Sequence, residues 1–145
     1  MAGCVGVTGV NLSAMADTLP SADGTLIERL GITFEEITSQ RTAGSMPVAG
    51  NTQPYGLLHG GATAALAETL ASYAANAHAP EGRVAVGIEL NATHHRSARE
   101  GWVHGVATAV HLGGNLASYE IVVVDDDGRR VCTARLTCML IDARA

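Results

Sequence analysis

The most constraining part of the sequence is residues 53–74, QPYGLLHGGATAALAETLASYA, which begins as a turn and continues as a helix. Pro54 and Gly56 mark the turn. No proline follows Gly60 within this stretch, and alanine, the residue with the highest helix propensity, is dense there. The sequence therefore predicts one long helix over about residues 59–77.

Two features of this helix point to chemistry. Gly60 and Gly61 lower helix stability, but they let a ligand approach the backbone amides at the N-terminus, where N–H groups are unpaired. Such amides suit the oxyanion that develops in acyl transfer. Glu68 is the only charged side chain between Arg41 and Glu81. An isolated carboxylate in an alanine-rich helix is unusual unless it has a function.

The spacing of these two features implies a site shared between chains. Glu68 follows Gly60 by eight residues, which is roughly 12 Å along one helix, so the two groups cannot act on the same carbonyl within one chain. Two copies packed antiparallel would bring Glu68 of one chain near Gly60 of the other. Ser72 lies one turn after Glu68 on the same face, where its hydroxyl can hold a water or bond the carboxylate.

Each of these residues also has a purely structural explanation. Glu68 can be a solvated surface charge, and Gly60 with Gly61 can be only a tight turn into the helix. His59 can bond a carbonyl at the helix start, and Ser72 can be a small packing residue. Their joint occurrence is more informative than any one of them.

The rest of the chain reads mainly as strands. After the long helix the pattern changes to a period of two, in which Val84, Val86, Ile88 and Leu90 alternate with smaller or polar residues, as in a half-buried strand. On the next strand Val103, Gly105, Ala107 and Ala109 form a face of small side chains that can accommodate a helix. The expected elements are a short helix over 21–30 and strands over 32–38, 41–48, 84–90, 102–112, 118–124 and 130–141.

Two local signals refine this order of elements. The run DDDG at 125–128 is a strong turn signal and joins the last two strands as a hairpin. Pro47 implies the end of the second strand or an edge position. Long strands that follow the helix argue against βαβ alternation and favour an α+β fold with a mostly antiparallel sheet of about six strands.

Composition limits the class of protein. With 145 residues and 47% apolar content, the chain can bury one core; we expect a flexible leader over 1–18 and a single domain over 19–145. We find no apolar run of 18 residues and no charged signal-peptide start, so we expect a soluble, cytoplasmic protein without a membrane partner.

The net charge of −5 argues against nucleic acid as a partner. All nine formal cations are arginines, so an anionic substrate would need local arginines.

The cysteines and histidines indicate neither disulfides nor a metal site. Cys132 and Cys138 are six residues apart on one expected strand, roughly 20 Å, which is too far for a disulfide. Cys4 lies in the expected leader. The adjacent pair His94 and His95 suits neither a helical nor a one-face metal site. We therefore expect no metal and a reducing compartment.

At four motifs the chain resembles the hotdog-fold acyl-CoA thioesterases of the PaaI-like branch. The motifs are QPYGLLHGGA at 53–62, LAETLAS at 66–72, GIELNATHHRSAREG at 87–101 and HLGGN at 111–115. The similarity is greatest to the subgroup with the enterobactin-pathway proofreading, 1,4-dihydroxy-2-naphthoyl-CoA and Arthrobacter-type 4-hydroxybenzoyl-CoA thioesterases. The resemblance implies a hotdog fold, in which the sheet wraps round the long helix, and a dimer that pairs into a dimer of dimers.

The resemblance also implies a role for each candidate residue. Glu68 resembles the catalytic carboxylate, and the Gly60 amide resembles the donor that polarises the thioester carbonyl. Gln53 resembles the side chain that orients the reacting group, His59 the histidine that contacts the thioester or positions the nucleophile, and Ser72 the hydroxyl that orients water. Coenzyme A would lie along Gly87, His94, His95, Arg96, Ser97, His111, Leu112, Gly113, Gly114 and Asn115, and no cofactor is implied. Arg96, with Arg99 beside it, can pair with phosphates.

Several questions stay open at this level. Glu68 can act as general base toward water or as a nucleophile that forms an anhydride. The substrate can be a CoA ester, expected to be aromatic, or a thioester on a carrier protein. Further alternatives are a non-catalytic acyl-CoA-binding domain and a dehydratase of the same fold. No GxSxG motif supports an α/β-hydrolase, and Ser-His-Asp catalysis has no motif behind it.

Overall fold

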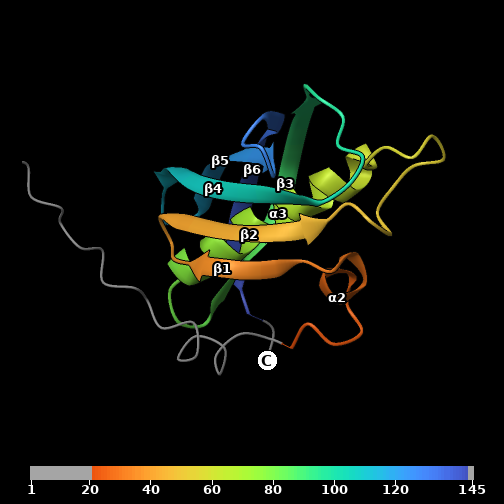
Figure 1. Ribbon diagram of the computed structural model, residues 1–145. Helices are drawn as coiled ribbons and strands as arrows, with labels where there is room; N and C mark the ends of the chain where they lie inside the picture. The colour runs from red at the N-terminus through yellow and green to blue at the C-terminus, as the bar shows by residue number, and fades with distance from the viewer. Residues whose placement is uncertain (1–20, 144–145) are drawn as a thin grey trace, which may run out of the picture.

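The computed structural model describes residues 21–143 and contains a six-stranded antiparallel sheet against one long helix (Figure 1). The strand order is β1-β2-β4-β5-β6-β3, so β1 and β3 form the two edges. The predicted α+β arrangement of six strands and one long helix is confirmed, whereas the leader predicted for 1–18 lies outside the described residues. The elements are α2 (Leu26–Leu30), β1 (Thr33–Ile37), β2 (Arg41–Pro47), α3 (Gly60–His78), β3 (Arg83–His94), β4 (Trp102–Leu112), β5 (Leu116–Asp125) and β6 (Arg130–Asp142).

The long helix α3 agrees with its prediction to within one residue at either end. His59 is its N-cap, and the ring Nδ1 accepts a hydrogen bond from the backbone N–H of Gly61 at 2.8 Å. The helix stops at Ala79, before Pro80, which cannot continue it. One face is buried against the sheet through mostly small side chains, namely Ala62, Thr63, Leu66, Ala67, Leu70, Ala71, Ala74 and Ala75.

A pair of glycines lets the helix approach the centre of the sheet. Gly44 of β2 lies opposite Gly105 of β4 in the antiparallel register, and the Leu70 side chain packs on both. A Cβ at Gly105 would be 2.6 Å from Cδ1 of Leu70, and one at Gly44 would be 2.9 Å from Cδ2. The predicted small-residue face of 102–112 is therefore the face that receives α3.

Gly44→Ala is expected to lower the free energy of unfolding by about 2 kcal/mol, because the new Cβ overlaps the Thr33 carbonyl oxygen as well as Leu70. Urea unfolding followed by circular dichroism measures this. Gly114→Ala is the control for stability, since no atom lies within 4 Å of its added Cβ. Equal midpoints for the two variants would contradict close packing at the glycine pair.

The buried face of β3 differs from the one that the alternation of apolar residues indicated. Val84, Val86 and Ile88 are exposed, whereas Ala85 is buried. The reason is the closeness of α3, which leaves room only for small residues on the inner face of this strand. A β-bulge between Gly87 and Glu89 then changes the phase, so that Leu90 packs against the core.

Several shorter predictions are confirmed and two are corrected. The first helix ends at Gly31 in the left-handed conformation (φ 70°), as predicted, but it begins only at Leu26, after a turn in which the Thr25 N–H donates to the Ala22 carbonyl. β2 is an interior strand that ends at Pro47, so the edge alternative is wrong. The β5–β6 hairpin turns through 125–128, and Cys132 and Cys138 are both free and buried.

Candidate active site

Six of the residues selected from the sequence line one cavity at the N-terminus of α3. The cavity has a volume of about 350 Å³. The six residues are Gln53, Gly60, His94, His95, Arg96 and Ser97, and the remaining lining includes Leu57, Leu58 and Thr63. A loop before the helix and a loop after β3 therefore converge on the helix start, although they are far apart in the sequence.

Gln53 is held by a tight turn that extends away from the sheet (Figure 1). Its backbone N–H donates to the Leu57 carbonyl at 2.8 Å, and its side-chain oxygen accepts from the Tyr55 N–H at 2.6 Å. The side-chain NH₂ is a second donor, suited to a ligand in the cavity. Tyr55 at the tip is 86% exposed.

Gly60 sits at the positive end of the helix, beneath the His94 ring. A Cβ on Gly60 would lie 2.9 Å from Nε2 of His94, so any side chain would displace the imidazole. The Gly60 N–H belongs to the first turn, where amides have no partner within the helix. The neighbouring His59 uses Nδ1 for the N-cap, which leaves Nε2 of its exposed ring to contact a ligand.

Glu68 lies outside this cavity, in contact with β3. It is exposed, and its Oε1 is 2.7 Å from the position that a Cβ on Gly87 would take. Two helical turns separate it from Gly60, so this single chain does not bring the two predicted catalytic groups together. Gly87, which is expected along coenzyme A, lies beneath the carboxylate.

Ser72 and Cys138 complete the surroundings of Glu68. The Ser72 hydroxyl hydrogen-bonds to the Cys138 sulfur. Burial raises the pKa of the Cys138 thiol, the Ser72 bond opposes this, and the charge of Glu68 adds to it. The thiol therefore stays neutral beside the carboxylate. No sequence pattern indicates Cys138 as a neighbour of this site, because only the β3–β6 register, which pairs it with Gly87, brings it here.

The HLGGN segment, residues 111–115, lies at the opposite end of α3 from the cavity. Nε2 of His78 is 2.9 Å from the Gly113 carbonyl oxygen, and Nη1 of Arg83 donates to the Gly114 carbonyl at 2.7 Å. A helix of 19 residues is about 28 Å long. Within one chain, the expected coenzyme A residues thus fall into three places: 94–97 at the cavity, Gly87 beneath Glu68, and 111–115 at the far end of α3.

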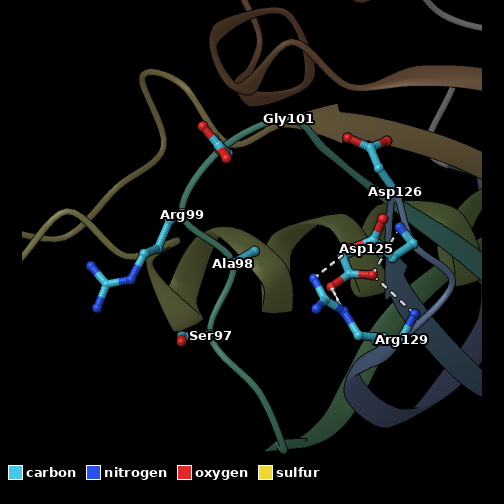
Figure 2. A pocket seen from close by; sticks show the side chains of 9 residues that line it. Ser97, Ala98, Arg99, Gly101, Asp125, Asp126 and Arg129 are labelled. Carbon is cyan, nitrogen blue, oxygen red and sulfur yellow. Dashed lines mark hydrogen bonds and ion pairs between the residues drawn. The ribbon is translucent and has the colours of Figure 1, made fainter.

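A second hollow, of about 370 Å³, lies beside the β5–β6 turn (Figure 2). Its charged groups already pair with one another, since Arg129 contacts Asp125 at 2.9 Å and Asp127 at 2.8 Å. Arg99 points away from these carboxylates. We therefore do not assign a substrate to this hollow. Within residues 21–143, no cluster of three histidine, cysteine or acidic side chains can hold a metal ion.

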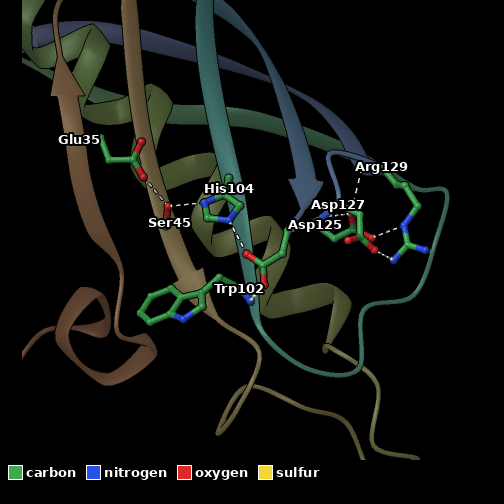
Figure 3. A network of polar contacts seen from close by, with 8 residues as sticks. Glu35, Ser45, Trp102, His104, Asp125, Asp127 and Arg129 are labelled. Carbon is green, nitrogen blue, oxygen red and sulfur yellow. Dashed lines mark hydrogen bonds and ion pairs between the residues drawn. The ribbon is translucent and has the colours of Figure 1, made fainter.

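Ser45, His104 and Asp126 form a chain of hydrogen bonds across the sheet (Figure 3). Ser45 Oγ is 2.8 Å from Nδ1 of His104, and Nε2 of His104 is 2.8 Å from Asp126. The bond from His104 and one from the Trp102 N–H lower the pKa of Asp126. Ser45 is buried, and its hydroxyl is also 2.5 Å from Glu35. The Ser45 hydroxyl is thus buried and already hydrogen-bonded, so we assign a structural role to this chain of residues.

Comparisons with known proteins agree with this architecture. The family model described as Thioesterase superfamily matches residues 55–132. The proofreading thioesterase EntH of Klebsiella pneumoniae is 50% identical over 117 residues, which cover 80% of this chain and 85% of that protein.

Two solved structures show the same arrangement. Thioesterase PA1618 of Pseudomonas aeruginosa, as a variant with one glutamine replaced by alanine, has a TM-score of 0.83 and 36% identity, covering 92% of this chain and 96% of that chain. SAV0944 of Staphylococcus aureus, as a variant with one glutamate replaced by alanine, has a TM-score of 0.79 and 29% identity, covering 81% and 99%.

The fold and these relatives define the class of this protein as a hotdog-fold thioester hydrolase. The chain belongs to the thioesterase superfamily. Within residues 21–143, none of the helices is long and apolar enough to cross a membrane.

Proposed function

We propose that this enzyme hydrolyses acyl-CoA esters, with an aromatic or related acyl group, in active sites formed by two chains. The observation that carries the proposal is the placement of two half-sites along β3. Glu68 lies against Gly87, the fifth residue of this 12-residue strand, and Gly60 lies against His94, its last residue. The first half-site contains the Glu68 carboxylate without the helix N-terminus, and the second contains the Gly60 N–H without the carboxylate.

The free edge of β3 supports the pairing of two chains. β3 is a 12-residue edge strand with exposed apolar side chains, and such an edge is a template for another strand. Antiparallel pairing of two β3 strands about a two-fold axis between residues 90 and 91 would place Gly87 of one chain opposite His94 of the other. Glu68 would then face the partner's helix N-terminus, and a dimer of dimers is the assembly we propose.

In this site the thioester carbonyl oxygen accepts a hydrogen bond from the Gly60 N–H, and the Gln53 amide orients the reacting group. Glu68 either removes a proton from the attacking water or attacks the carbonyl carbon itself to give an anhydride that water then opens. Either route breaks the C–S bond and releases the acid and a protonated thiol. His59 contacts the thioester, and Ser72 orients water near the carboxylate.

A relative gives independent support for the pair Gln53 and Glu68. SAV0944 was studied as two variants, one with a glutamine and one with a glutamate replaced by alanine. These two positions are fifteen residues apart in that chain, which is the separation of Gln53 and Glu68 here. The comparison supports a shared role for the two residues.

For coenzyme A we propose two contact regions, one from each chain. Arg96 and Ser97, with His94 and His95, border the cavity, and the partner's 111–115 segment would approach the same site after pairing. Arg96 supplies a local cation on an acidic protein. Free, buried Cys132 and Cys138 fit a reducing, cytoplasmic location.

A carrier-protein thioester is the second candidate substrate, because relatives at 45% and 50% identity are named proofreading thioesterases. The reaction and the half-sites would be the same, and only the group that bears the thiol would differ. A dehydratase or a non-catalytic binder has no comparable support.

A panel of CoA esters tests the proposal, with free thiol as the readout. Benzoyl, hydroxybenzoyl, hydroxynaphthoyl, phenylacetyl, hexanoyl and palmitoyl esters are compared at equal concentration. We expect the fastest release with an aryl ester. Release only from an aryl-loaded carrier protein would favour the second candidate, and no release from either substrate would contradict the proposed function.

A further inference from the structure

The backbone conformation at residue 87 does not require a glycine. Seven glycines within residues 21–143 have positive φ, and Gly87 is not one of them. The added Cβ would meet no backbone atom among its nearest neighbours, in contrast with Gly44, whose Cβ would overlap the Thr33 carbonyl. The space in front of Gly87 is instead occupied by a side chain.

That side chain is Glu68. Its Oε1 lies 2.7 Å from the Cβ position of Gly87, and its Cδ lies 3.6 Å away. A carbon and a carboxylate oxygen cannot approach to 2.7 Å without repulsion, because atoms in contact are separated by about 3.5 Å. The carboxylate therefore lies against the backbone of β3, in the space that the side chain of any other residue at position 87 would occupy.

The other neighbours do not fix the carboxylate as closely. Leu136 Cδ1 is 3.4 Å from the same Cβ position, and Cys138, opposite Gly87 in the register, is a neutral buried thiol that bonds Ser72. A β-bulge follows Gly87, and the next side chain, Ile88, is exposed. Because Glu68 is exposed and the overlapping atom is the end of its side chain, an added Cβ at residue 87 would move the carboxylate and not the strand.

We propose that Gly87 is a positioning residue for the Glu68 carboxylate, which rests on this glycine. The inference rests on the proposed function, since it assumes that Glu68 is the reacting carboxylate. An added methyl group at residue 87 lifts the carboxylate away from β3 and misaligns it with the carbonyl. A misplacement of about 1 Å costs on the order of 100-fold in rate.

Steady-state kinetics of Gly87→Ala tests the proposal. We expect kcat to fall about 10- to 100-fold, with KM changed less than about twofold. Glu68→Asp shortens the side chain by one methylene, so the double variant Gly87→Ala, Glu68→Asp should lose less than the product of the two single losses. A raised KM with unchanged kcat, or losses that multiply, would overturn the positioning role.

Thermal unfolding tests the contact without using activity. The change in Tm caused by Gly87→Ala should be less favourable in the wild-type background than in Glu68→Ala, because only the wild type contains the overlapping carboxylate. Gly105→Ala is the matched control, because its Cβ meets Leu70, and its cost should be equal in both backgrounds. Equal costs for Gly87→Ala would overturn the contact.

Two further outcomes separate this inference from the proposed function. If Gly87→Ala folds only together with Glu68→Ala, the contact is supported; if it folds in neither background, the contact is overturned. If Glu68→Ala hydrolyses esters at the wild-type rate, the proposed function is overturned. The role of Gly87 in catalysis is then overturned as well, even if the unfolding data still show the contact.

Discussion

Glu68→Ala is expected to lower kcat for the best ester by about 1,000-fold, with KM changed less than about threefold. A general base or a nucleophile acts mainly in the transition state, so its loss reduces kcat and not ground-state binding. The exposed position of Glu68 on α3 means that the fold should tolerate the change, and the far-ultraviolet circular dichroism spectrum should be unchanged.

Two further variants refine this test. Glu68→Gln keeps the shape and removes the charge, and it should be nearly as inactive as Glu68→Ala. Glu120→Gln changes an exposed carboxylate on β5 and should hydrolyse at the wild-type rate. A Glu68→Gln enzyme that retains wild-type kcat would show that the carboxylate is not the reacting group.

A mixture of two inactive variants is expected to regain about a quarter of the wild-type activity. Gln53→Ala removes a group at the helix N-terminus, and Glu68→Ala removes one in the middle of the helix, which belongs to the other half-site. After random exchange, half of the dimers are mixed, and each mixed dimer has one intact site of two. Joint unfolding and refolding from urea, followed by the thiol assay, measures the recovery.

The matched control for this mixture is Gln53→Ala refolded with the double variant Gln53→Ala, Glu68→Ala. No combination of these chains contains an intact Gln53, so no recovery is expected. Native mass spectrometry with one isotope-labelled chain verifies that mixed dimers have formed. Absence of recovery in verified mixed dimers would mean that each site lies within one chain.

The sequence predicted those parts of the structure that depend on local chemistry. Alanine density and the absence of proline defined α3, and the DDDG run defined the β5–β6 turn. The small-residue face of β4 was also predictable, because a helix needs such a face to pack closely. At the helix start, Gly60 and Gln53 were recognisable from their motif, and they do share one cavity.

Other features depend on tertiary distances that no local pattern contains. The alternation pattern indicated the wrong face of β3, because the larger apolar residues were expected to be the buried ones. In the structure α3 lies so close that the small Ala85 is buried, whereas Val84 and Val86 are exposed. Cys138 reaches Ser72 only through strand register. Arg83 and His78 fix the 113–114 carbonyls through the fold, and nothing in their sequence neighbourhood indicates this.

The glycine pair in the middle of the sheet has a consequence for the chemistry at its edge. Leu70 rests on Gly44 and Gly105, and this contact fixes the rotation of α3 about its own axis. Glu68 is two residues earlier on the helix, about 200° around that axis. Any rotation of the helix would swing the carboxylate along an arc relative to β3. The orientation of Glu68, the proposed reacting group, therefore also depends on two glycines buried in the core.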